Sequence, residues 1–209
     1  MTRSRFLVVV ACVVLANGVH ADEARFEVTP WLGLVTGGSI DDVVDDETLD
    51  LGDGSYAALS FNIAAPNGGS YEFYYARQDT DLESGGLLAA TPVLDLTIEY
   101  LQFGGTYGFE TDQGFQPYGL LTIGAARFTP DAPGLSDETC FAATIGAGMR
   151  FDVSRALAIK LEARAMVNFV DSDSAIFCDS GGGNANCAVA IRSDSIIQWS
   201  ASAGLAYRF

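Results

Sequence analysis

The last stretch of the chain, residues 195–209, alternates between two kinds of residue. A repeat of two is the geometry of a β-strand, whose side chains point to opposite faces in turn. Strands of soluble proteins usually have about 5–6 residues, whereas a tilted strand needs about 9–11 to cross a bilayer. The stretch therefore predicts a membrane-spanning strand, and the alternative is the last strand of a soluble β-sandwich. Its apolar positions are Ile197, Trp199, Ala201, Ala203, Leu205, Tyr207 and Phe209.

Seven earlier stretches alternate in the same way and are also predicted to be strands. They are residues 25–35, 55–65, 70–79, 94–109, 115–128, 139–151 and 157–169. Residues 157–169 are rich in helix formers, but a strand puts Lys160, Glu162 and Arg164 on one side and a helix would scatter them. In residues 94–109 the apolar alternation changes face after Tyr100, which predicts a β-bulge.

The connections between these strands alternate in length. Residues 36–53, 79–93, 129–138 and 170–194 form long connections, and residues 65–69, 110–114 and 152–156 form short ones. Short turns at one end and long loops at the other are typical of small outer-membrane barrels. The predicted fold is therefore all-β, an eight-stranded antiparallel up-and-down transmembrane β-barrel. A soluble up-and-down barrel is the alternative.

The face that is not apolar predicts what lies inside the barrel. It carries charges of both signs among small residues, as expected of side chains that pair in a narrow interior. The predicted barrel-interior charge network is Glu72, Glu99, Arg150, Lys160, Glu162, Arg164 and Arg208. Because a buried charge without its partner is costly, Arg164→Ala is expected to destabilise the barrel. Removing Glu99 or Glu72 as well is expected to recover part of that loss.

The first 21 residues predict a secretory signal peptide. Arg3 and Arg5 precede an apolar run at 6–16, and Val19-His20-Ala21 ends in a small-residue cleavage site. The predicted division is a signal peptide at 1–21 and one barrel domain at 22–209. Cleavage before Cys12, as in a lipoprotein, is a weaker alternative because it would leave a very short apolar core.

The charge of the chain excludes one class of partner. Without Arg3 and Arg5 the chain has 9 basic and 27 acidic residues, a net charge of −18. Nucleic-acid binding needs basic patches and is not expected. Seven acidic residues lie in the first long connection: Asp41, Asp42, Asp45, Asp46, Glu47, Asp50 and Asp53. Their spacing does not match an EF-hand, so a solvated acidic loop is favoured over a calcium site.

Histidine and cysteine limit the chemistry that the chain can perform. The only histidine, His20, lies in the predicted signal peptide, so the exported chain would have no imidazole for nucleophilic or acid–base catalysis. We expect no enzyme, no cofactor and no metal. Cys178 and Cys187 bracket a glycine-rich stretch and are predicted to form a disulfide in an oxidising compartment. Cys140 is left as a free thiol inside the barrel or as the partner of one of the other two.

The stretches YLQFGGTYGF, QPYGLLTIGAARF, LEARAMVNFVDSDSAIFC and ASAGLAYRF resemble proteobacterial outer-membrane β-barrels of the OmpA/OmpX-like group. The resemblance implies a location in the outer membrane of a Gram-negative bacterium. It also implies contact with lipid and lipopolysaccharide. In that family the assembly machinery reads the last strand, here through Tyr207 and Phe209. Many members have no assigned function, so the resemblance is specific for the fold and not for an activity.

Three functions remain open from the sequence. The first is a monomeric, plugged scaffold that displays acidic extracellular loops and has a structural role in the envelope. The second is transport, through a narrow pore or by passage of hydrophobic molecules into the membrane. The third is adhesion or binding through the loops, with the acidic stretch at 38–53 as the first candidate.

Overall fold

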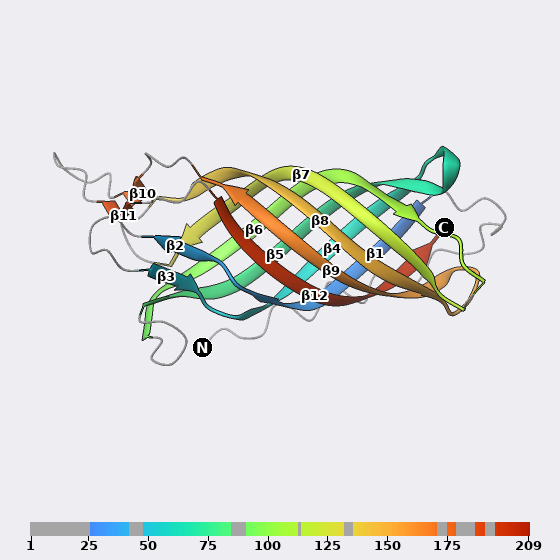
Figure 1. Cartoon of the computed structure of the whole chain (residues 1–209), viewed down its shortest axis with the longest axis horizontal. Coiled ribbons are helices and arrows are strands. Elements are labelled where there is room, and N and C mark those ends of the chain that lie inside the picture. The colour runs from blue at the N-terminus through green and yellow to red at the C-terminus, as the bar shows by residue number, and fades with distance from the viewer. Residues whose placement is uncertain are drawn as a thin grey trace.

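The computed structural model describes residues 26–41, 48–84, 91–112, 114–131, 136–170, 175–178, 187–190 and 195–209. Within these residues, eight long antiparallel strands close into a barrel, as predicted (Figure 1). They are β1 (Phe26–Thr36), β4 (Gly54–Ala64), β5 (Gly69–Ser84), β6 (Thr91–Gly108), β7 (Gln116–Pro130), β8 (Glu138–Asp152), β9 (Leu157–Phe169) and β12 (Ser195–Arg208). None of the described helical turns is long and apolar enough to span a membrane.

The barrel closes where its first and last strands meet. β1 pairs with β12 in antiparallel register, with Trp31 opposite Gly204. The chain end takes part in this seam, because the Phe26 and Phe209 backbones exchange two hydrogen bonds, of 3.2 and 2.9 Å. Every other long strand pairs with the next long strand along the chain, which gives the up-and-down topology.

The outer wall of the barrel is apolar and the inner wall is largely polar. Leu32, Leu101 and Ile145 are 73, 68 and 62% exposed, while Glu72 and Arg164 on the inner wall are 0 and 1% exposed. A soluble barrel would be arranged in the opposite sense, because it hides apolar surface from water. The orientation of the faces therefore excludes the soluble alternative and makes the outer wall a lipid-facing surface.

The predicted β-bulge in residues 94–109 is wrong. β6 pairs residue by residue with β7 from Leu96 to Gly108, and the only irregularity with β5 is at Leu82/Glu83. Ile98 and Tyr100 are buried inside, while Leu101 faces outward. No bulge is needed for the apolar residues to change face. At the loop end of β6 the interior is apolar and the outer wall is polar, whereas further along the strand the outer wall is apolar.

Each of the four predicted long connections contains strand residues. β5 continues to Ser84 and β6 begins at Thr91, so both enter the predicted 79–93 loop. The first connection contains β2 (Ser39–Asp41) and β3 (Thr48–Leu51), and β3 pairs with β5. The last contains the hairpin of β10 (Ala175–Cys178) and β11 (Cys187–Ala190). Figure 1 shows these short strands gathered at one end of the barrel. The short turn η2 (Pro66–Gly68) follows β4.

Two glycines let β6 and β7 approach closely. A Cβ added at Gly124 would lie 2.1 Å from the Leu101 carbonyl oxygen, and one at Gly104 would lie 2.0 Å from that of Leu121. Backbone atoms of a neighbouring strand cannot rotate away as a side chain can. Both positions therefore require glycine for steric reasons.

Gly124→Ala is expected to destabilise the barrel by about 1–3 kcal/mol, since the added methyl group forces the two backbones apart. Urea unfolding in detergent micelles, followed by tryptophan fluorescence, measures this loss. Gly114→Ala is the control for the added methyl group, because no atom lies within 4 Å of the Gly114 Cβ position and Gly114 is not among the glycines with a positive φ. Equal losses at the two sites would contradict the steric argument.

Candidate functional site: the interior of the barrel

The middle of the barrel is closed by a buried ion-pair cluster. Arg164 donates a 2.9 Å hydrogen bond to Glu72 and a second bond to Glu162, and none of the three side chains is solvent-exposed. The Arg164 guanidinium lies 3.8 Å from the centre of the Tyr74 ring. The Tyr118 hydroxyl donates to Glu162 at 2.8 Å. We call these five residues the central cluster.

The central cluster crosses the full width of the barrel. Glu162 and Arg164 are two residues apart on β9 and so share its inner face. Glu72 comes from β5, and three strands separate β5 from β9 in either direction around the wall. The Arg164–Glu72 pair therefore joins opposite walls and obstructs the interior between them. We call this pair the crossbar.

Uncharged polar residues fill the interior on the loop side of the central cluster. The Gln198 Oε1 accepts hydrogen bonds from Tyr100 at 2.7 Å and from Gln78 at 3.4 Å. Asn168 donates to the Tyr100 hydroxyl at 3.0 Å. Beyond this layer lies an apolar group that includes Val35, Leu51, Leu96, Ile98, Phe128 and Ile196. The interior thus becomes less polar towards the loops.

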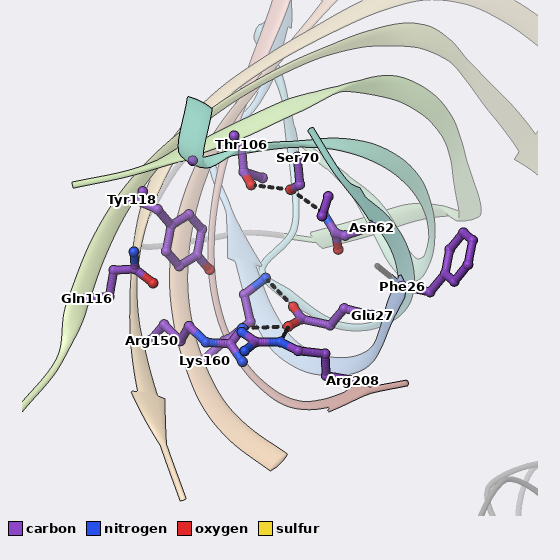
Figure 2. A pocket seen from close by; sticks show the side chains of 14 residues that line it. Phe26, Glu27, Asn62, Ser70, Thr106, Gln116, Tyr118, Arg150, Lys160 and Arg208 are labelled. Atoms are coloured by element: carbon purple, nitrogen blue, oxygen red, sulfur yellow. Dashed lines mark hydrogen bonds and ion pairs between the residues drawn. The ribbon is translucent and has the colours of Figure 1, made fainter. Parts of the chain in front are cut away.

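A second charged cluster lies at the short-turn end of the barrel (Figure 2). Glu27 on β1 accepts a 2.5 Å hydrogen bond from Arg150, and its oxygens lie 3.4 Å from Lys160 and 3.6 Å from Arg208. Arg150 also pairs with Asp152 at 2.8 Å. We call Glu27, Arg150, Lys160 and Arg208 the mouth cluster.

The structure places six of the seven predicted interior charges inside the barrel. Glu72, Glu162 and Arg164 are in the central cluster, and Arg150, Lys160 and Arg208 are in the mouth cluster.

Glu99 is the exception, and its predicted place in the network is corrected. It lies on the outer wall, where it accepts a 2.6 Å bond from Tyr75 and lies 3.8 Å from Arg77. The assumed bulge had put Glu99 on the wrong face.

Glu27 is the interior charge that the sequence reasoning missed. Its position was visible in the alternation, since it shares a face with Thr29 and Trp31, both of which are buried. Nothing in the sequence, however, indicated that three cations from β8, β9 and β12 would meet on one carboxylate of β1.

The structure describes the three cysteines of the predicted exported chain to different extents. Cys178 and Cys187 are direct register partners in β10 and β11, and opposite residues of an antiparallel pair are near enough for a disulfide; the disulfide stays a prediction. Among the described residues Cys140 is a free thiol packed against the apolar group.

The predicted signal peptide lies outside the described residues. Of the seven acidic side chains predicted in the first long connection, only that of Asp53 is described. In the described part of the chain no three His, Cys, Asp or Glu side chains gather as metal ligands would.

Solved structures of small membrane barrels resemble this chain. Neisserial surface protein A is 16% identical, with a TM-score of 0.59 over 92% of this chain and 100% of that one. The outer membrane protein OprG from Pseudomonas aeruginosa is 14% identical, with a TM-score of 0.61 over 90% of this chain and 97% of that one. At these identities the likeness shows the fold alone. The comparison with curated protein sequences gave no match.

The family is shown by a different comparison. The family model described as "Outer membrane protein beta-barrel domain" matches residues 7–209, which is nearly the whole chain. The match agrees with the apolar outer wall and with the closed antiparallel topology. This chain therefore belongs to the outer-membrane β-barrel protein family.

Proposed function

We propose that this protein is a non-conducting scaffold of the outer membrane that holds its loop-end strands outside the lipid. The observation that carries the proposal is the central cluster. Arg164 joins opposite walls through Glu72, and the side chains of both residues are completely buried. The Tyr74 and Tyr118 rings pack beside Arg164 and Glu162, so the crossbar leaves no wide passage at its height. An ion would have to break this cluster to pass.

The loop-end strands support the display role. β5 and β6 are 16 and 18 residues long, beyond the 9–11 or so that span a bilayer. Outward-facing residues on these extensions are charged, including Arg77, Asp79 and Glu99. Arg77 and Asp79 lie directly after the lipid-facing aromatic residues of β5. The strands therefore leave the membrane and continue into water, and the protein needs no catalytic group for this role.

Two contacts follow from the same arrangement. In barrels of this family the short turns face the periplasm and the long loops face outward. The belt of Arg77, Glu99 and Arg127 would then lie at the level of lipopolysaccharide head groups. The second contact is with the assembly machinery, which in this proposal reads the last strand through Tyr207 and Phe209. The scaffold acts as a monomer in this proposal.

Planar-bilayer recording of the protein purified from outer membranes tests the proposal. The folded barrel, verified by its heat-modifiable migration on gels, is expected to give no discrete conductance steps. A general porin in the same bilayer is the positive control. The triple variant Glu72→Ala/Glu162→Ala/Arg164→Ala is expected to conduct if it folds, because it removes the crossbar. Reproducible steps from the wild-type protein would favour the transport alternative and contradict the scaffold.

A further inference from the structure

The short-turn end of the barrel contains a cavity that the scaffold role does not use. Its volume is about 200 Å³, and it is lined by Arg150, Lys160 and Arg208 together with Glu27, Asn62 and Tyr118 (Figure 2). An engineered cavity of about 150 Å³ is large enough to hold benzene. This cavity therefore has room for a small polyatomic ion.

The charges around the cavity do not balance. Three cations meet on the single carboxylate of Glu27, and their nitrogens lie 2.5 to 3.6 Å from its oxygens. Among the described residues, the only other carboxylate paired with any of them is Asp152, whose side chain is 57% exposed. Glu110 and Asp112 line an adjoining hollow beside Arg150 and do not line this cavity. Within the mouth cluster three cations thus share one buried carboxylate, while deeper in the barrel Glu72 and Glu162 outnumber Arg164 by one.

Burial strengthens the effect of this local group of cations. The side chains of Lys160 and Arg150 are 5 and 9% exposed, so water screens them poorly. Lys160 gains part of its stabilisation from the faces of Trp31 and Tyr118, whose ring centres lie 5.2 and 4.9 Å from its nitrogen. A cation–π contact neutralises no charge. The cavity is therefore electropositive where the side chains of Arg150, Lys160 and Arg208 line it.

We propose that this cavity is a binding site for a phosphate-type oxyanion that enters from the periplasmic side. Arginine and lysine donate charge-assisted hydrogen bonds to such oxygens. Arg208, whose side chain is 36% exposed, lies at the entrance, and Lys160 lies deeper. The proposal concerns the opposite end of the barrel from the displayed strands and does not depend on the scaffold role.

One unpaired atom favours an oxyanion that also carries a proton. Asn62 is 4% exposed and lines the cavity, and its Oδ1 has no hydrogen-bond partner. Its Nδ2 is already used by Glu72 and Ser70, at 3.2 and 3.4 Å. A hydroxyl group of monohydrogen phosphate could donate to the free Asn62 oxygen while its charged oxygens face the cations.

Isothermal titration calorimetry tests the proposal with the protein purified from outer membranes in a non-ionic detergent. Inorganic phosphate is titrated at fixed ionic strength, and saturable binding with a Kd of about 1 mM or tighter is expected. Arg208→Gln is expected to weaken binding about tenfold, through loss of one charge-assisted contact. Arg127→Gln, which removes an exposed arginine paired with Asp137 on the outer wall, is the matched control and is expected to leave binding unchanged.

Glu27→Gln separates an anion site from a purely structural ion-pair cluster. It removes the carboxylate that competes for the three cations while keeping the side-chain shape. Phosphate binding is therefore expected to strengthen about tenfold, and a structural role alone predicts no such gain. If this variant does not fold, the comparison of Arg208→Gln with Arg127→Gln still decides the proposal.

The source of the phosphate is distinguished by a second ligand. Tighter binding of glycerol 3-phosphate than of inorganic phosphate would identify a lipid head group, and the reverse order would identify the free ion. Both orders support the site. No saturable heat with either ligand, or heat that Arg208→Gln and Arg127→Gln change equally, would overturn it.

Discussion

Arg164→Met is expected to lower the free energy of unfolding by about 3–5 kcal/mol. The substitution leaves Glu72 and Glu162 close together inside the barrel, without the cation that compensates both. Methionine fills much of the arginine volume, so the loss reports the missing charge more than a cavity. The cation–π contact with Tyr74 is lost as well. Urea unfolding in detergent micelles, with heat-modifiable gel migration as a second readout, measures the effect.

Double variants show whether the central cluster acts as one unit. Arg164→Met/Glu72→Gln is expected to recover part of the loss, because it removes one of the two uncompensated carboxylates. Glu99→Gln is the matched control and should give no recovery, since Glu99 pairs with Tyr75 and Arg77 on the outer wall. Strictly additive losses for Arg164 and Glu72 would show that the cluster is not coupled.

Leu121→Arg is expected to destabilise the barrel in a bilayer by about 2–4 kcal/mol. Leu121 is 60% exposed on the outer wall, near the middle of the apolar run of β7 that ends before Arg127. An arginine there would face lipid hydrocarbon, far from either interface. Unfolding in lipid vesicles, followed by tryptophan fluorescence, measures the cost.

The same substitution at the end of a strand provides the control. Leu157 also faces outward, but it begins β9 beside the short turn at 153–156. Leu157→Arg is expected to cost only about 0–1 kcal/mol, because its guanidinium can reach the interface. Equal costs at the two leucines would mean that depth does not matter, and the outer wall would not be a lipid-facing surface.

The sequence alone was sufficient to find the eight long strands and, apart from the loop end of β6, to separate the two walls of the barrel. β9 begins and ends at the predicted residues, although its composition favours a helix. The reason is local. Side chains of a strand alternate between faces, so the parity of Lys160, Glu162 and Arg164 places all three on one wall without knowledge of any neighbour.

The alternation of side chains along a strand, however, does not show whether a given part of the outer wall faces lipid or water. In β6 the apolar residues up to Tyr100 fill the interior, whereas Leu101 and Phe103 meet lipid. The sequence reasoning explained this change of face by a bulge and so placed Glu99 inside. The outer wall changes from lipid to water along one regular strand, and that boundary depends on the position of the whole barrel in the membrane.

The pairing of charges across the interior also needed the tertiary structure. Glu72 and Arg164 are 92 positions apart and meet only because β5 and β9 lie on opposite walls of a closed eight-stranded sheet. Glu27 meets its three cations because closure places β1 beside β12, and β9 and β8 are the next two strands around the wall. Alternation is a property of one strand's backbone, whereas partner choice depends on the closure and tilt of the sheet, which no single strand encodes.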